Sequence, residues 1–221
     1  MRIGLFGGTF DPIHWGHLRS AEEVREALCL DRVLFIPTPR PPHKRSQTIT
    51  SAQHRLEMVR RAVAGNPNFA VSTIEIERPG ISYSVDTVRH FAKKSAGRDS
   101  YFFIIGFDAF RDIASWKDYK EIFPLCHFVV TSRPGTGNGP YPLRRVPVAV
   151  RTAFCYSFRQ KAYKHRSGTF LYVVRLTDIA ISASDIRRRV NEGRSIRYLV
   201  PSEVEAYIEK HGIYQEPLEG R

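Results

Sequence analysis

The sequence lacks an apolar run long enough to cross a membrane, and it shows no amino-terminal leader pattern. Its 221 residues open with "MRIGLFGG", which reads as the start of a buried strand. Cysteines are few, and Cys29, Cys126 and Cys155 lie far apart without a CxxC pair, which excludes a zinc set. We therefore predict a cytoplasmic protein whose cysteines are buried free thiols.

Acidic residues are absent between Glu121 and Asp178, and the whole chain has a formal net charge of +12. This charge predicts anionic partners such as phosphates, nucleotides or nucleic acid. Basic and aromatic residues alternate within the acid-free span, as they do at single-stranded nucleic-acid surfaces. No compact RNA-binding motif accompanies them, so we favour a surface that attracts anionic substrates or an oligomer contact. No motif covers residues 135–168, whose role stays open.

Short apolar runs alternate with helical spacing through most of the chain. The predicted strands cover residues 2–6, 32–37, 69–77, 101–106, 127–132 and 169–176. Helices are expected from residue 17, over 51–65, 84–94, 108–114 and 119–123, and near the end from Ser184 and Ser202, with Ser84 as a cap. This order predicts an α/β fold with a doubly wound parallel sheet, whose ligands bind beyond the carboxyl ends of the strands.

The stretch "FGGTFDPIHWGH", residues 6–17, joins the first predicted strand to the first helix. Its paired glycines allow a tight turn and a close approach of the backbone to a ligand. The helix start supplies N–H groups and partial positive charge, which suit a phosphate. His14 and His17 can point donors at the same anion. The string is neither a P-loop nor a GxGxxG, and the alternative is that both rings cap the helix and pack.

This string resembles the HxGH motif of the nucleotidyltransferase superfamily, and more specifically that of the nicotinate-nucleotide adenylyltransferase family. Further stretches match that family in its order. They are "PPHK" (41–44), "SYSVDT" (82–87), "FIIGFDAF" (103–110), Trp116, "SRPG" (132–135) and "ISASDIR" (181–187). The resemblance covers most of the chain and implies one Rossmann-like domain over residues 1–221. Its core would span residues 1–180, and helices at 181–221 would complete the ATP site.

The reaction implied by the resemblance transfers AMP from ATP to nicotinate mononucleotide, giving deamido-NAD and pyrophosphate. The attacking phosphate is already anionic at pH 7, so no general base is needed. What remains is to align two anions and to neutralise charge, with Mg²⁺ accompanying ATP and no dedicated protein metal site expected.

The resemblance also implies roles for individual residues. The catalytic set is His14, His17 and Arg187. The ATP set is Gly7, Gly8, Thr9, Phe10, His14, Gly16, His17, Gly106, Asp108, Ser132, Arg133, Ile181, Ser184 and Arg187. The nicotinate mononucleotide set is Gly8, Thr9, His43, Lys44, Tyr83, Ser84 and Trp116. Asp108 would accept hydrogen bonds from the ATP ribose, and Trp116 would stack on the pyridine ring.

Two positions depart from the family pattern. Ala183-Ser184 stands where the family often has Ser-Thr, and Ser84 stands where a Thr is common. The preference for the acid over the amide is therefore less firmly implied than the reaction. Two alternatives stay open: a related enzyme that uses nicotinamide mononucleotide, and a nucleotide- or RNA-binding regulatory protein on the same fold. A homo-oligomer is also compatible with the sequence.

Overall fold

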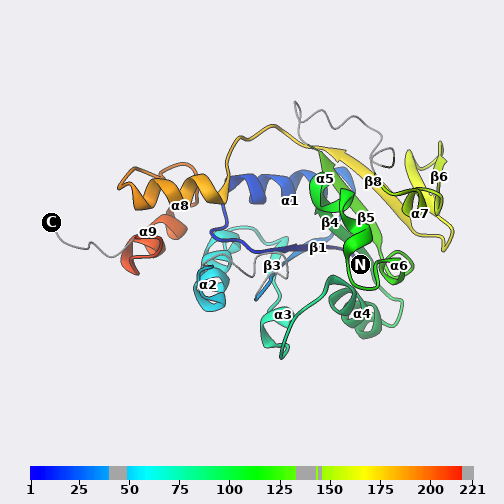
Figure 1. Ribbon diagram of the computed structural model, residues 1–221, viewed down its shortest axis with the longest axis horizontal. Helices are drawn as coiled ribbons and strands as arrows, with labels where there is room; N and C mark the ends of the chain where they lie inside the picture. Colours follow the sequence, from blue (N-terminus) through cyan, green and yellow to red (C-terminus); the bar gives the residue numbers. More distant parts are fainter. Residues whose placement is uncertain (40–48, 133–142, 144–145, 216–221) are drawn as a thin grey trace.

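The computed structural model describes residues 1–39, 49–132, 143 and 146–215 (Figure 1). Its strands are β1 (Arg2–Gly8), β2 (Arg32–Pro37), β3 (Phe69–Val71), β4 (Ser100–Gly106), β5 (His127–Ser132), β6 (Phe154–Ser157), β7 (Ala162–His165) and β8 (Phe170–Arg175). Its helices are α1 (Trp15–Ala27), α2 (Ala52–Val63), α3 (Ile74–Glu77), α4 (Ser84–Ser95), α5 (Phe107–Arg111), α6 (Tyr119–Ile122), α7 (Val148–Arg151), α8 (Ala183–Asn191) and α9 (Ser202–Lys210), with a 3-10 turn η2 at Ile113–Ser115.

One sheet carries all of these strands, in the order β3-β2-β1-β4-β5-β8-β7-β6. The pairs from β3 across to β8 are parallel, whereas β7 pairs with β8 and β6 with β7 in antiparallel fashion. The predicted doubly wound parallel sheet is confirmed, with an antiparallel hairpin added at one edge. From β1 to β3 the strands are added toward one edge of the sheet, and from β4 onward they are added toward the other edge. Such sheets bind their ligands at this reversal of strand order, which lies between β1 and β4.

The centre of the sheet, at β4 and β5, is buried on both faces because these strands are apolar on both sides. On β4, Phe102 and Ile104 pack with α1 and α2, while Phe103 and Ile105 pack with α4 and α5. Helices α8 and α9 belong to the first of these cores. They lie at one end of the molecule, far from the β6–β7 hairpin at the other (Figure 1).

The strand predicted over residues 69–77 is wrong beyond Val71, because residues Ile74–Glu77 form helix α3. The alternation of Ile and Glu in "IEIE" imitates the period of a strand. The local contacts decide otherwise. Thr73 Oγ1 donates to Glu77 Oε1 at 2.6 Å across one helical turn, and Glu75 turns inward to accept from Thr87.

The hairpin of β6 and β7 was not expected from the sequence. Its strands have four residues each, and only Ala162 and His165 among them are buried, so no clear alternation marks them. Of the cysteines, Cys126 is the buried free thiol that was expected, whereas Cys29 and Cys155 are free but exposed. Among the described helices, none has both the length and the apolar character that a membrane span needs.

Candidate active site

The loop after β1 folds over the side chain of Phe10. A Cβ on Gly8 would lie 2.8 Å from Phe10 Cζ, so only glycine leaves room for this ring. Phe10 itself has a left-handed backbone (φ 48°) and is buried against Phe6 and Phe35. Its side chain therefore faces the core, which leaves only its backbone available for the predicted contact with ATP.

Gly16 lies beneath the ring of His14. A Cβ at this position would sit 3.0 Å from His14 Nδ1 and 3.1 Å from its Cε1. His14 is the extended N-cap residue of α1, and its side chain is only 3% exposed. The glycine between the two histidines is thus explained by close packing of an imidazole on the first turn of the helix.

The two imidazoles stack with ring centroids 3.7 Å apart. The backbone N–H of His14 donates to His17 Nδ1 at 3.3 Å, so in the neutral ring of His17 the proton sits on Nε2. In this tautomer Nε2 carries the ring N–H. His17 is half-buried, and the edge of Phe10 meets its ring at 5.1 Å. The pair stands at the amino end of α1, where the helix dipole attracts an anion.

The carboxyl-terminal segment packs directly against this loop. Arg187 Nη1 donates to the carbonyl of Asp11 at 2.7 Å, and the N–H of Trp15 donates to the carbonyl of Leu199 at 3.1 Å. The carbonyl of Ile181 lies 3.9 Å from the position of a Cβ on Gly16. Tyr214 donates to Asp11 Oδ1 at 2.7 Å, and burial is the main cause that raises the pKa of this phenol. The structure therefore brings Ile181 and Arg187 to the histidine loop.

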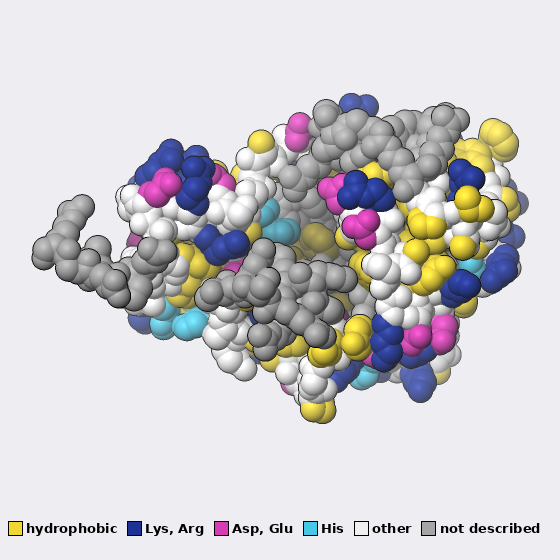
Figure 2. All heavy atoms as spheres, in the orientation of Figure 1, with side chains coloured by type: hydrophobic (Ala, Val, Ile, Leu, Met, Phe, Trp, Pro, Cys, Tyr) yellow, Lys and Arg dark blue, Asp and Glu magenta, His cyan; other side chains and the backbone are white. Residues whose placement is uncertain are grey.

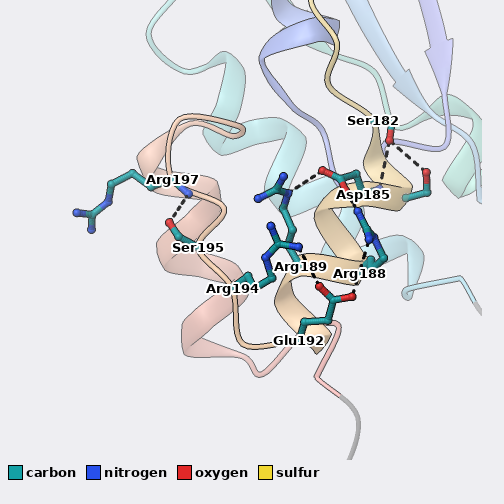
Figure 3. Close-up of polar contacts among 9 residues, drawn as sticks. Ser182, Asp185, Arg188, Arg189, Glu192, Arg194, Ser195 and Arg197 are labelled. Atoms are coloured by element: carbon teal, nitrogen blue, oxygen red, sulfur yellow. Dashed lines mark hydrogen bonds and ion pairs between the residues drawn. The ribbon is translucent and has the colours of Figure 1, made fainter.

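The other arginines of α8 have different partners. Arg188 and Arg189 both pair with Asp185, the latter at 2.7 Å (Figure 3). The helix, predicted to begin at Ser184, begins at Ala183 and is capped by Ser182, whose Oγ accepts from the N–H of Asp185. Ser184 Oγ lies 3.2 Å from Ser182 Oγ and is exposed. Arg187 is thus the α8 arginine that reaches the loop.

A cavity of about 440 Å³ opens beyond the carboxyl ends of β1, β2 and β4. Several predicted site residues line it, namely Gly7, Gly8, Thr9, Tyr83, Ser84, Gly106 and Trp116. Figure 2 shows a hollow near the middle of the face in view, with histidine atoms at its edge. The cavity and the histidine pair are linked through Gly8, because the Phe10 ring that covers this glycine also contacts His17.

Helix α4 points its amino end at this cavity. Its N-cap is Tyr83, with an extended backbone, and Ser84 is the first helical residue, so the predicted Ser84 cap is wrong by one position. The N–H groups of Asp86 and Thr87 donate to the carbonyl of Tyr83 at 3.0 and 3.2 Å. The start of the helix offers the N–H of Ser84 and the positive end of the dipole to a negatively charged group.

Trp116 is half-buried at the cavity wall, where its ring meets the edge of Phe103 at a centroid distance of 6.1 Å. Lys117 follows it, and its ammonium lies 4.6 Å from the centre of the Tyr83 ring and 3.9 Å from Asp86 Oδ2. An indole and a cation thus flank the start of α4. This end of the cavity suits a flat ring that carries a carboxylate.

The remaining predicted residues are placed less directly. Gly106 lines the cavity, but the Asp108 side chain is 83% exposed and lies 3.8 Å from Arg111 Nη1. Ser132 ends β5 and pairs with Arg175. The predicted contacts at His43, Lys44 and Arg133 lie outside the described residues.

Several cavity residues were not singled out from the sequence. Thr38 follows directly after β2, the position at which parallel sheets bind ligands, so its place in the chain was a usable signal. Glu75 gave no such signal, because it lies in the segment misread as a strand. It is buried, Thr87 Oγ1 donates to it at 2.8 Å, and burial is the main cause that raises the pKa of this carboxyl group.

Residues 5–189 match the cytidylyltransferase-like family model. A probable nicotinate-nucleotide adenylyltransferase of Geotalea daltonii is 49% identical over 218 residues, which cover 98% of this chain and 99% of that protein. A protein of the same name from Thermus thermophilus is 45% identical over 215 residues, covering 97% and 100%.

The chain belongs to the nicotinate-nucleotide adenylyltransferase family. Solved structures agree with the fold of this family. The Plasmodium falciparum nicotinic acid mononucleotide adenylyltransferase complexed with NaAD has a TM-score of 0.74, with 99% of both chains covered and 16% identity. The same enzyme complexed with APC has a TM-score of 0.72. The resemblance of its sequence motifs to the nicotinate-nucleotide adenylyltransferase family is therefore confirmed.

Proposed function

We propose that this protein transfers AMP from ATP to nicotinate mononucleotide. The observation that carries the proposal is the stacked pair His14–His17 at the amino end of α1, next to a cavity that ends at Trp116 and α4. A phosphate oxygen of the mononucleotide attacks the α-phosphorus of ATP. The bond from that phosphorus to the bridging oxygen breaks, and pyrophosphate leaves with the electron pair. The products are deamido-NAD and pyrophosphate.

The protein's task in this reaction is to align and neutralise charge. The nucleophile is a phosphate that is already anionic, so no side chain has to remove a proton. His17 donates from Nε2 to the α-phosphate, because its Nδ1 is occupied by the N–H of His14. One such preorganised donor typically stabilises the transition state by about 3–4 kcal/mol.

The other ATP contacts follow from the same placement. His14, the first turn of α1 at Gly16, and Arg187 hold the triphosphate, with Ile181 and Ser184 beside them. Residues 181–221 complete this site, a role supported by the bond from Arg187 to Asp11 and by that from Trp15 to Leu199. We also keep the predicted contacts of Gly106, Asp108, Ser132 and Arg133 with the nucleotide as part of the proposal.

Mg²⁺ enters this scheme as part of the substrate MgATP. The described residues contain no group of three or more His, Cys, Asp or Glu side chains that could hold a metal ion. Mg²⁺ is commonly bound through substrate phosphates and water. In the proposal the triphosphate supplies ligands to Mg²⁺, and the protein's donors bind the phosphate oxygens that remain. We place the reaction in the cytoplasm, where ATP is available.

The mononucleotide lies in the cavity with its ring on Trp116 and its carboxylate at the start of α4. Gly8 and Thr9 approach its phosphate, and His43 and Lys44 complete this contact in the proposal. The N–H of Ser84 and the helix dipole favour an anion over a neutral amide. This preference for a carboxylate supports the acid, rather than nicotinamide mononucleotide, as the substrate.

Pyrophosphate release tests the proposal. The purified protein is given MgATP with either the acid or the amide mononucleotide, and the initial rate is measured over a range of concentrations. We expect a kcat/KM at least 10-fold higher for the acid. A higher kcat/KM for the amide would show that nicotinamide mononucleotide is the substrate instead. An absence of pyrophosphate release with both mononucleotides would overturn the proposed function.

A further inference from the structure

The largest fully buried side chain among the described residues is a cation, Arg55 on α2, with 0% exposure. Its guanidinium has no carboxylate within ion-pair distance among the described residues. Instead it donates to four backbone carbonyls. Nε binds the carbonyl of Thr50 at 2.9 Å, Nη1 those of Thr9 and Thr38 at 2.7 Å each, and Nη2 that of Pro39 at 2.6 Å.

These carbonyls come from three separate segments. Thr9 lies in the loop after β1, Thr38 and Pro39 follow β2, and Thr50 precedes α2. Thr9 and Thr38 also line the cavity, whereas Arg55 does not. The buried guanidinium therefore joins the segment after β1 to the segment after β2, and both segments contribute a residue to the cavity lining.

The planarity of the peptide bond makes these contacts directional. In a trans peptide the carbonyl and the following N–H point in opposite directions. When Arg55 draws the carbonyl of Thr9 toward itself, the N–H of Phe10 is turned away from Arg55. The side chain thus fixes the orientation of the peptide unit as well as the distance between the two loops.

The electrostatic setting of Arg55 is consistent with this geometry. Burial lowers its pKa, and Asp11 partly opposes that effect from a distance. Asp11 is itself held by Tyr214 at 2.7 Å and by the N–H of Thr50 at 3.4 Å. A lysine could supply the charge but not the planar fork, so it would satisfy fewer of the four carbonyls.

We propose that Arg55 is a positioning residue for the mononucleotide site, because it sets the spacing and orientation of the β1 and β2 ends. This inference rests on the proposed function. It makes Arg55 necessary for tight binding of the mononucleotide, while the contacts of His17 with ATP are made from another helix. The expected loss on its replacement is in KM for nicotinate mononucleotide more than in kcat.

The test uses Arg55→Lys and Arg55→Met, with Val150→Ala as a control. Val150 is buried on α7 and does not line the cavity, so its replacement reports loss of stability alone. KM for each substrate, kcat and Tm are measured for every variant. We expect both Arg55 variants to raise KM for the mononucleotide at least 10-fold, and to change KM for ATP and kcat by a smaller factor, because Thr9 belongs to both predicted sets whereas Thr38 lines the cavity alone. Val150→Ala should leave both KM values unchanged.

A KM for the mononucleotide within 2-fold of wild type in folded Arg55→Lys would overturn the proposal. If neither variant folds, the wild-type protein still decides by NMR. The Arg55 Nε–H resonance should shift on addition of nicotinate mononucleotide alone, and an unchanged resonance at saturation would refute the role. Wild-type pyrophosphate release is measured first, so that failure of the proposed function is distinguished from failure of this inference.

Discussion

Replacement of Gly16 by alanine should lower kcat while it leaves the thermal stability of the fold nearly unchanged. The new Cβ would lie 3.0 Å from His14 Nδ1 and 3.1 Å from Cε1, closer than the 3.4–4 Å of ordinary contact. His14 is 3% exposed, so its ring has little free space in which to move. Movement of the His14 ring would also move His17, because the two rings stack with their centroids 3.7 Å apart.

The geometry gives the size of each effect. The ring must move by a few tenths of an ångström, and a misplacement of about 1 Å costs on the order of 100-fold in rate. We therefore expect kcat to fall by about 4- to 6-fold. Alanine favours a helical position over glycine by about 0.5–1 kcal/mol, which offsets the tight contact. The Tm should stay within about 4 °C of wild type.

Steady-state pyrophosphate release and thermal unfolding measure these two quantities. Gly65→Ala is the matched control, because nothing lies within 4 Å of its added Cβ, and it should leave kcat unchanged. A Gly16→Ala protein with normal kcat and normal Tm would refute the packing argument. A large fall in Tm would instead show that the contact disrupts the fold.

Three further predictions follow from the same site. His17→Ala should lower kcat by about two to three orders of magnitude with little change in Tm, and near-normal turnover would refute its role. Trp116→Ala should raise KM for nicotinate mononucleotide, and an effect on ATP alone would show the assignment to be wrong. The pKa of Glu75 in the folded protein is raised above its ordinary value of 4.5. The neutral side chain therefore contributes stability that is fully present below pH 4.5. This contribution is lost as the pH rises through the folded-state pKa. The free energy of unfolding of Glu75→Gln in urea, minus that of wild type, should therefore increase with pH over this window. A difference that stays constant with pH would contradict the raised pKa.

Strands buried on both faces were the easiest feature to predict. Residues 32–37 and 127–132 are apolar runs closed by a proline or a polar residue, and both match β2 and β5. The hairpin of β6 and β7 gave no such signal, because an edge with few buried residues has no apolar pattern to read. The predicted cap at Ser84 was misplaced because Tyr83 adopts the extended cap geometry, and the helix predicted from Ser184 begins at Ala183, one residue earlier.

Some residues of the candidate site could be predicted from the sequence, and others could not. The glycine and histidine loop could be read from sequence, because each residue type there has a specific chemical use. Arg55 could not, since an arginine on a helix is usually exposed. Its spacing did hold a signal, because it precedes the buried Met58 and Val59 by three and four residues. Only the fold brings it to the carbonyls of loops that are distant in sequence.

The most direct test of the account is a crystal structure with a non-hydrolysable ATP analogue and nicotinate mononucleotide bound together. We expect His17 Nε2 at about 3 Å from an α-phosphate oxygen, with the triphosphate at the amino end of α1 and the pyridine ring against Trp116. A triphosphate bound elsewhere, with neither imidazole within hydrogen-bond reach of it, would contradict the account.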